Sequence, residues 1–296
     1  MPPKTTLRPL LCAALAALSA GCFEHAAPRR DVTAFSPEEA ASLRDTATFL
    51  DYSLATNLAA FPADLGSFPA LRRVSVRGQK SAAEVPASVA DAKGLYELDL
   101  AGTGLKDLPA EAASLPALRN LYLSDNGLAE LPAAVCGMKG LTYLNLDRNA
   151  LTNLPDAIGD LAALKWVRLN GNKLSDLPES AAKWTDVRRV YLRGNGLKEV
   201  PPVVLQMASL EELDLGDNDL TSLPEGLCAL PSLHRLDVDG NPRLAKLPGS
   251  MTNMTQLTHL FAFRTAIPTN EQARVRAAMP DTVRHFMAFS PLFRPR

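Results

Sequence analysis

The chain repeats a pattern of leucines every 23 residues, and this period constrains its fold more than any other feature. Similar runs open at positions 118, 141, 164 and 210, as in "LRNLYLSDNGLAELP" and "LTYLNLDRNALTNLP". A fixed period of about 20 to 50 residues indicates a solenoid of stacked repeats. Nine copies lie between residues 58 and 267, and they open at Leu71, Leu95, Leu118, Leu141, Leu164, Val187, Leu210, Leu233 and Leu257.

The position of a residue within the repeat predicts where its side chain lies. The fourth and sixth residues, such as Leu144 and Leu146, are apolar and alternate with polar ones, which predicts a strand that turns them inward. Strands of successive repeats would stack in parallel about 4.8 Å apart. The ninth residue falls where the backbone leaves the strand, and an amide there can both donate and accept hydrogen bonds. We therefore assign a structural ladder to Asn126, Asn149, Asn172, Asn195, Asn218 and Asn241.

The full pattern, L-x-x-L-x-L-x-x-N-x-L-x-x-L-P, resembles the leucine-rich repeat. It is most similar to the 23-residue type found in plant intracellular Ras-group proteins and in bacterial repeat lipoproteins. The resemblance implies an α/β solenoid with a curved parallel sheet on its concave face and short helical turns or extended segments on its convex face. The prolines that end the pattern fix φ and donate no hydrogen bond, which favours short turns over long helices. Trp184 occupies an apolar position of the convex side, so we assign it to the core.

Both ends of such a solenoid need lids, because a terminal repeat lacks a neighbour against which to bury its apolar face. We expect an N-terminal cap over residues 36–57, in which Ser36 and Glu39 form a capping box and a helix runs from about residue 37 to 50. We expect a C-terminal cap over residues 268–296. It would contain a helix and an alternating run over 282–286 that adds a last strand and covers the sheet edge.

The first 22 residues have the features of a secretory signal. Basic residues precede an apolar run from Leu10 to Ala20, which is too short for a permanent membrane span. The segment Leu18 to Cys22 resembles a bacterial lipobox, in which the cysteine becomes the lipidated first residue, although Ser19 stands where leucine is usual. The expected organisation is a signal peptide over residues 1–21 and a lipid-anchored tether over 22–35, with the lipid on Cys22.

The residue after Cys22 is Phe23 rather than aspartate, and by the same resemblance this favours the outer membrane of a bacterial cell envelope. The alternative is ordinary signal cleavage near Ala20, which would leave Cys22 as a free thiol and release the protein.

We find no sequence motif for a metal, a cofactor or catalysis. The four histidines are scattered and never fall at metal-ligand spacing. The segment "DVDGNP" at 237–242 resembles the start of a calcium loop, but its twelfth position is Pro248 rather than glutamate. There is neither a glycine-rich phosphate loop nor a nucleophile elbow. A net charge of −1 supplies no bulk field for nucleic acid. We therefore expect no catalytic residue, no metal site, no cofactor and no nucleic-acid partner.

Strands in register would place the third, fifth and seventh residues of each repeat in three columns on the concave face. Aromatic and basic residues gather there in the central repeats, and the following repeats turn acidic. Tyrosine, tryptophan and arginine are the residue types enriched in binding hot spots. We therefore assign partner binding to Tyr122, Tyr143, Trp166, Arg168, Arg189, Tyr191 and Arg193, as an aromatic and basic centre beside an acidic field. The alternative is that Arg189 is satisfied internally, by stacking on Trp166 and pairing with Glu212.

These features favour a monomeric, non-catalytic module that binds a protein or peptide in its concave face and contacts the membrane only through its N-terminal lipid. Two alternatives stay open. The resemblance to Ras-group proteins would make the chain an intracellular, cytoplasmic scaffold for a small GTPase. The chain would otherwise be a purely structural envelope protein.

Overall fold

A computed structural model of the protein describes residues 31–278 and 288–289 of the 296. The chain divides into two units, Met1–Asp31 and Val32–Arg296, and the strands and helices given below belong to the second. The predicted signal peptide and Cys22 lie outside the described residues.

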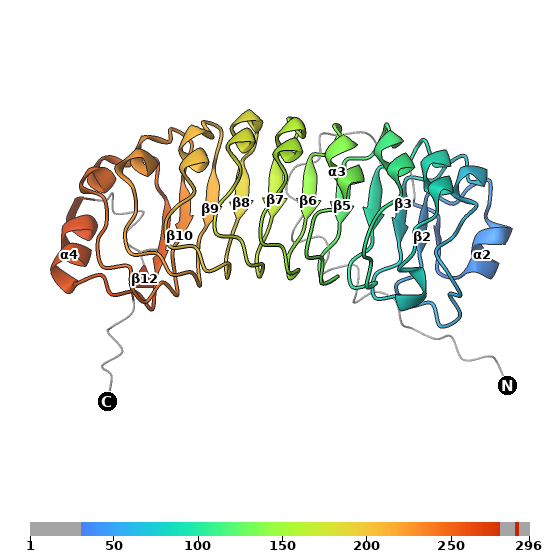
Figure 1. The fold of residues 1–296 in the computed structure, drawn as a ribbon, viewed down its shortest axis with the longest axis horizontal. Helices are drawn as coiled ribbons and strands as arrows, with labels where there is room; N and C mark the ends of the chain where they lie inside the picture. The colour runs from blue at the N-terminus through green and yellow to red at the C-terminus, as the bar shows by residue number, and fades with distance from the viewer. Residues whose placement is uncertain (1–30, 279–287, 290–296) are drawn as a thin grey trace, which may run out of the picture. The chain divides into compact units, whose positions relative to one another are not determined.

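In the described residues, twelve short strands form one parallel sheet whose strands follow one another in chain order (Figure 1). The sheet lines the inner side of the curved repeats, which confirms the predicted fold class. The strands are β1 (Thr33–Ala34), β2 (Phe49–Asp51), β3 (Arg73–Ser75), β4 (Glu97–Asp99), β5 (Asn120–Tyr122), β6 (Tyr143–Asn145), β7 (Trp166–Arg168), β8 (Arg189–Tyr191), β9 (Glu212–Asp214), β10 (Arg235–Asp237), β11 (His259–Ala262) and β12 (Ala288–Phe289).

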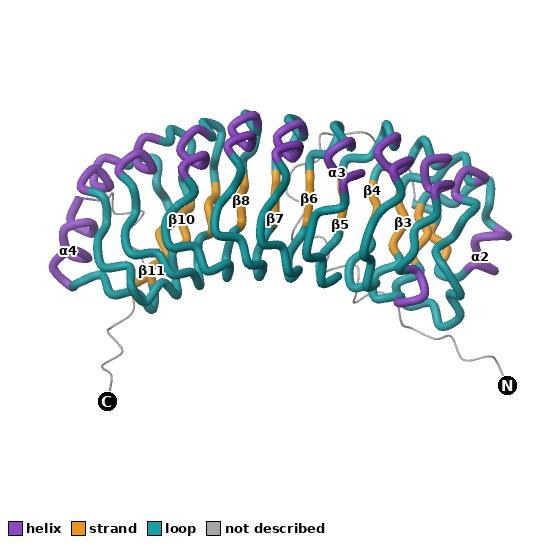
Figure 2. The backbone as a smooth tube through the Cα atoms, in the orientation of Figure 1, coloured by secondary structure: helices purple, strands orange, loops and turns teal. Residues whose placement is uncertain are grey.

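Single helical turns return the chain along the outer side of the repeats (Figure 2). Most of them directly follow a proline with φ near −65°, as at Pro155 and Pro178, where the missing amide donor has no effect on the turn. The turns are η2 (Leu65–Ser67), η3 (Lys80–Ala82), η4 (Ala87–Asp91), η5 (Ala110–Ser114), α3 (Ala133–Gly137), η6 (Asp156–Asp160), η7 (Glu179–Lys183), η8 (Pro202–Gln206), η9 (Glu225–Ala229) and η10 (Gly249–Asn253).

The core fills the space between the sheet and these turns. The inward strand positions are fully buried, as Leu144 and Leu146 show. Trp184 lies on the convex side of this core with no exposed surface, as its position in the repeat predicts, and its Nε1 donates to the Ile158 carbonyl of the preceding repeat at 3.0 Å. A buried indole N–H group needs such a hydrogen-bond partner, because an unpaired one would lower the stability of the fold.

The asparagines at the ninth position bond to the backbone of two adjacent repeats. Asn149 is an example: its Nδ2 donates to the carbonyls of Leu123 and Leu146, both at 3.0 Å. Its Oδ1 accepts from the amides of Asn126 at 3.1 Å and Leu128 at 3.0 Å. One side chain therefore satisfies four backbone groups that water does not reach, which is the reason for an amide at this position.

Other side chains take this place near the N-terminal end of the ladder. Thr103 Oγ1 donates to the Leu100 carbonyl at 3.0 Å, and Gln79 Nε2 donates to the carbonyls of Tyr52 at 2.9 Å and Ala55 at 3.0 Å. Gln79 thereby joins the first repeat to the N-terminal cap.

The N-terminal cap differs from the prediction in where its helix ends. Helix α2 (Pro37–Ser42) begins at the predicted capping box, with Ser36 Oγ accepting from the Glu39 amide at 3.2 Å. It ends at Ser42 rather than near residue 50, because Phe49–Asp51 is strand β2 and pairs with β3. Strand β1, at residues 33–34 of the predicted tether, pairs with β2. The edge of the first repeat is thus covered by strands as well as by a helix.

The C-terminal cap begins with α4 (Thr269–Ala278). Arg274 joins this helix to η10 by donating to the carbonyls of Pro248 at 3.0 Å and Gly249 at 3.2 Å. The predicted strand over 282–286 lies outside the described residues. On the side away from β10, β11 pairs with β12 (Ala288–Phe289), and this pairing is parallel like the others.

Candidate binding face

The concave sheet carries the candidate site, because its register aligns equivalent residues of successive repeats. Tyr143, Trp166, Arg189, Glu212 and Arg235 are direct cross-strand neighbours from β6 to β10. Adjacent strands lie about 4.8 Å apart, so each of these side chains can contact the next.

Four aromatic rings from β5 to β8 form a continuous group, which we call the aromatic stack: Tyr122, Tyr143, Trp166 and Tyr191. Their ring centroids are separated by 4.9 Å, 5.0 Å and 5.9 Å in that order. The last two contacts are edge to face, with interplanar angles of 89° and 78°, a geometry that the charge distribution of the rings favours. All four side chains are half-buried, so the stack presents a partly covered apolar strip rather than freely exposed rings.

Burial in the stack keeps its phenols neutral. It raises the pKa of Tyr143 to about 12, and it raises the pKa values of Tyr122 and Tyr191 further. For Tyr191 the neighbouring Glu212 adds to the effect of burial, because the Tyr191 Oη donates to Glu212 Oε2 at 2.8 Å and this bond needs the protonated phenol.

Trp166 differs from the surface residue that the repeat pattern predicts. Its ring is half-buried between Tyr143 and Tyr191, and the Arg189 guanidinium lies 5.0 Å from its centroid. Its Nε1 is shielded from solvent and has no hydrogen-bond partner among the described residues. An unmade hydrogen bond of this kind costs about 1 to 3 kcal/mol.

The predicted basic centre does not hold free cations, because each of its arginines pairs with a carboxylate of the sheet. Arg168 Nη2 lies 2.6 Å from Asp147 Oδ2, and Arg189 Nε lies 3.1 Å from Glu212 Oε1. The basic centre is therefore paired internally, and acidic residues lie beside it, such as the cross-strand neighbours Asp214 and Asp237. For Arg189, the structure contains both internal contacts of the alternative interpretation.

Arg193 bridges three successive repeats. Its guanidinium lies 3.1 Å from Asp214, 2.6 Å from Asp217 and 2.9 Å from Asp237. It passes over Gly216, two residues after the end of β9, where an added Cβ would overlap the guanidinium. Burial alone lowers the pKa of Arg193, but its contacts with the Asp214 carboxylate raise it overall, so the charge is retained.

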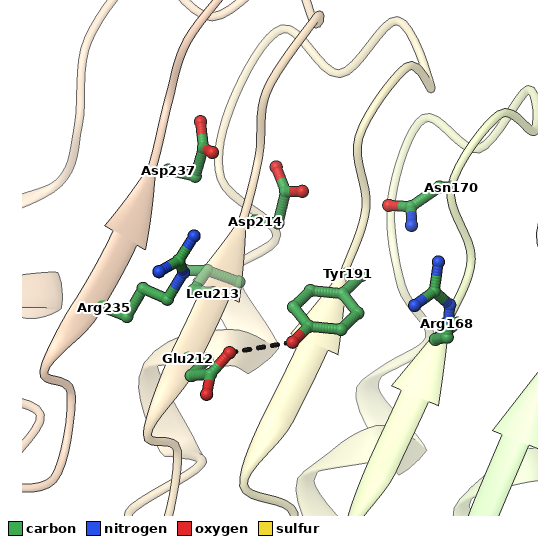
Figure 3. Close-up of a pocket in the computed structure, with 8 residues that line it drawn as sticks. All are labelled: Arg168, Asn170, Tyr191, Glu212, Leu213, Asp214, Arg235 and Asp237. Atoms are coloured by element: carbon green, nitrogen blue, oxygen red, sulfur yellow. Dashed lines mark hydrogen bonds between the residues drawn. The ribbon is translucent and has the colours of Figure 1, made fainter. Parts of the chain in front are cut away.

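A pocket of about 250 Å³ opens on the concave face between β7 and β10 (Figure 3). Tyr191 and Glu212 lie at its centre and are joined by their hydrogen bond. The pocket is lined by Arg168, Asn170, Tyr191, Glu212, Leu213, Asp214, Arg235 and Asp237.

Of the predicted binding residues, only Arg168 and Tyr191 line this pocket. The other predicted residues form the remainder of the stack or the ion pairs beside it. The prediction did not include the other six lining residues, which are Asn170, Glu212, Leu213, Asp214, Arg235 and Asp237. A count of charges along the third column could have found Arg235, because Arg189 and Arg235 flank the single acid Glu212.

In residues 31–278 and 288–289, no cluster of histidine, cysteine and acidic residues could hold a metal ion. Within the same ranges, no helix combines the length and the apolar character needed to cross a bilayer.

The similarity to known proteins lies in the repeats. The leucine rich repeat family matches residues 93–149, 116–174 and 185–242. The Arabidopsis receptor kinase HAESA, solved in complex with the peptide hormone IDA and the co-receptor SERK1, is 27% identical, with 74% of this chain and 38% of that chain covered at a TM-score of 0.63. The leucine-rich repeat domain of the type III effector XopL is also 27% identical, with 73% and 75% covered at a TM-score of 0.60.

TLR13, solved in complex with ssRNA13, is 25% identical, with 76% of this chain and 34% of that chain covered at a TM-score of 0.65. The chain thus spans well under half of HAESA and of TLR13, and most of the XopL domain. Among curated proteins, none matches the chain by sequence.

Proposed function

Because the chain is a leucine-rich-repeat protein, we propose that its concave face binds an extended peptide or protein segment and catalyses no reaction. The observation that carries this proposal is the aromatic stack, which runs across four strands and ends at the pocket between β7 and β10. An apolar strip leading to a polar pocket supplies both contact area and orientation for one segment of chain.

A peptide fits this face better than a nucleic acid does. Binding to a phosphate backbone depends on cations that can replace counterions. Arg168, Arg189 and Arg193 are each engaged by carboxylates of the sheet and are not available for this role. Among the similar structures, HAESA was solved with a peptide hormone, which agrees with the proposal, and TLR13 was solved with RNA.

The proposal is tested by removing the apolar surface while leaving the repeats intact. The double variant Tyr143→Ala, Trp166→Ala should lose the partner that the unaltered chain captures from a cell-envelope extract. Tyr96→Ala is the matched control, because Tyr96 is also a half-buried tyrosine but precedes β4 and lies outside the stack. Capture that both variants retain equally would contradict the role of the stack, and an unaltered chain that captures no partner would favour the alternative of a purely structural protein.

We also propose that the protein is anchored to the bacterial cell envelope, at the outer membrane, by a lipid on Cys22. The support is the sequence of residues 1–23, with its basic start, its apolar run and its partial lipobox. Metabolic labelling with palmitate should mark the unaltered chain and not Cys22→Ser. An unlabelled chain with an intact N-terminus would contradict this proposal and favour the cytoplasmic alternative, in which the chain is a scaffold for a small GTPase.

We expect a monomer. Light scattering coupled to size exclusion tests this expectation, and a mass of twice 31.8 kDa would contradict it.

A further inference from the structure

The pocket between β7 and β10 contains a guanidinium, that of Arg235, for which no described carboxylate serves as an ion-pair partner. Arg235 lies over the Phe261 ring, 4.7 Å from its centroid, and Glu212 is its direct neighbour on β9. Glu212 is already engaged on its other side by Arg189, at 3.1 Å, and by the Tyr191 hydroxyl, at 2.8 Å. Arg189 and Arg235 thus flank one glutamate, and the Glu212 carboxylate forms an ion pair only with Arg189.

Each of the other charged residues that line the pocket has an ion-pair partner outside it. Arg168 pairs with Asp147, which lies on the turn after β6. Asp214 and Asp237 both contact Arg193, at 3.1 Å and 2.9 Å. Arg193 supplies one positive charge for these two carboxylates, so the pocket has no excess of positive charge as a whole; Arg235 is the charged side chain of its lining that no described ion pair engages.

A second arginine in the same column shows what Arg235 lacks. Arg73 on β3 also lies over an aromatic ring, 4.2 Å from the centroid of Phe49, and it also has a glutamate as its neighbour on the next strand. Its Nε pairs with that glutamate, Glu97, at 3.2 Å. Both arginines are half-buried. The arrangement of ring, guanidinium and carboxylate is complete at Arg73, and at Arg235 the carboxylate is missing.

We propose that the pocket binds the carboxylate of an aspartate or glutamate side chain, with Arg235 as its anchor, and that this residue belongs to the extended segment of the proposed function. A guanidinium can bind a carboxylate through two parallel hydrogen bonds, which adds orientation to charge. The volume of about 250 Å³ suits one side chain of the segment rather than a larger element.

The position of the pocket favours a side chain over a chain end. The aromatic stack reaches the pocket from β5 and ends in it at Tyr191, and the sheet continues beyond the pocket to β11. A bound segment can therefore pass over the pocket in both directions and lower one side chain into it beside Arg235 (Figure 3).

Peptide pools of defined chemistry test the proposal. Fluorescent nonapeptides with blocked ends carry random uncharged residues around a central Asp, Glu, Asn or Gln, and anisotropy measures their binding to the full chain. We expect the acidic pools to bind roughly tenfold more tightly than the amide pools, which corresponds to about 1.4 kcal/mol. Arg235→Gln should abolish this difference. Arg73→Gln, the matched control, should preserve it.

The possible outcomes separate this inference from the function on which it rests. Binding without an acidic preference, or a preference that Arg73→Gln removes equally, would overturn the role of Arg235 and leave peptide binding intact. The same pools with unblocked ends form a further arm, and binding that appears only with a free C-terminus would overturn the assignment to a side chain. If no pool binds, both proposals fail. Should Arg235→Gln melt at a lower temperature, Arg235→Lys provides the second variant, because it keeps the charge without the paired donors and should show a reduced preference.

Discussion

Replacing Gly216 with alanine tests whether Arg193 holds three repeats together. At most positions that an L-residue can adopt, a change from glycine to alanine stabilises a protein by about 0.4 to 1 kcal/mol, because the unfolded chain loses freedom. Gly216 does not have a positive φ, so its backbone alone predicts this gain. Its added Cβ, however, would overlap the Arg193 guanidinium and displace it from Asp214, Asp217 and Asp237. The two effects have opposite signs.

The net change in the free energy of unfolding depends on how much the Arg193 contacts contribute. The Arg193 side chain is 28% exposed and lies within 3.1 Å of three carboxylates. Exposed ion pairs contribute about 0 to 1 kcal/mol each and charged hydrogen bonds about 1.5 to 3 kcal/mol, so about 1 kcal/mol for each contact is a moderate value. The loss of three contacts costs about 3 kcal/mol, and the gain in the unfolded chain offsets less than 1 kcal/mol of it. We expect Gly216→Ala to be destabilising by about 2 kcal/mol.

Urea unfolding followed by circular dichroism measures this change in a double-mutant cycle. In an Arg193→Ala background there is no guanidinium to displace, and Gly216→Ala should then be neutral or stabilising. If Gly216→Ala stays destabilising by about 2 kcal/mol in that background, the backbone around Gly216 requires the glycine. The explanation through Arg193 is then wrong.

Three further predictions concern stability. Asn172→Ala should lower the free energy of unfolding by about 1 to 3 kcal/mol, because it leaves the buried Leu151 amide without a partner and removes one of the two side-chain donors from the carbonyls of Leu146 and Leu169; urea unfolding measures the loss. Trp184→Phe should cost about 1 to 3 kcal/mol in the same assay, since the Ile158 carbonyl keeps only the Leu161 amide as its donor and a cavity remains. The raised pKa of Tyr143, about 12, favours the folded state fully below pH 10, and this contribution should disappear between about pH 10 and 12 as the phenol ionises. Unfolding midpoints across that range check the sign, and Tyr143→Phe should flatten the decline.

The repeated part of the fold could be predicted because its period fixes the environment of each position. Leu144 had to face inward and Asn149 had to meet unpaired backbone groups once the strands stacked in register. The N-terminal cap could not be predicted in the same way, since it departs from the repeat. Its apolar spacing continues from α2 into Phe49–Asp51, and only pairing with β3 makes that segment a strand.

The sequence predicts which residues lie on the concave face, but it does not predict all of their ion pairs. Register places Arg189 beside Trp166 and Glu212, so these contacts could be anticipated from the columns. The reach of Arg193 depends on its rotamer and on the bare backbone of Gly216, and neither follows from the period. The pocket depends on how Glu212 divides its bonds between two neighbours, which is decided by side-chain geometry.

The ion pairs beside the aromatic stack bear on how tightly the face can bind. Ordering a loop or a flexible side chain at an interface reduces affinity, because its lost freedom opposes association. Here Arg168 and Arg189, which lie against the rings of Tyr191 and Trp166, are fixed by Asp147 and Glu212 in the free protein. Arg193 fixes the carboxylates on the far side of the pocket. These pairs remove cations from direct recognition and, in exchange, hold the apolar strip and the pocket walls in place before a ligand arrives. Binding energy from the stack and from Arg235 would therefore be spent on the ligand rather than on arranging the sheet.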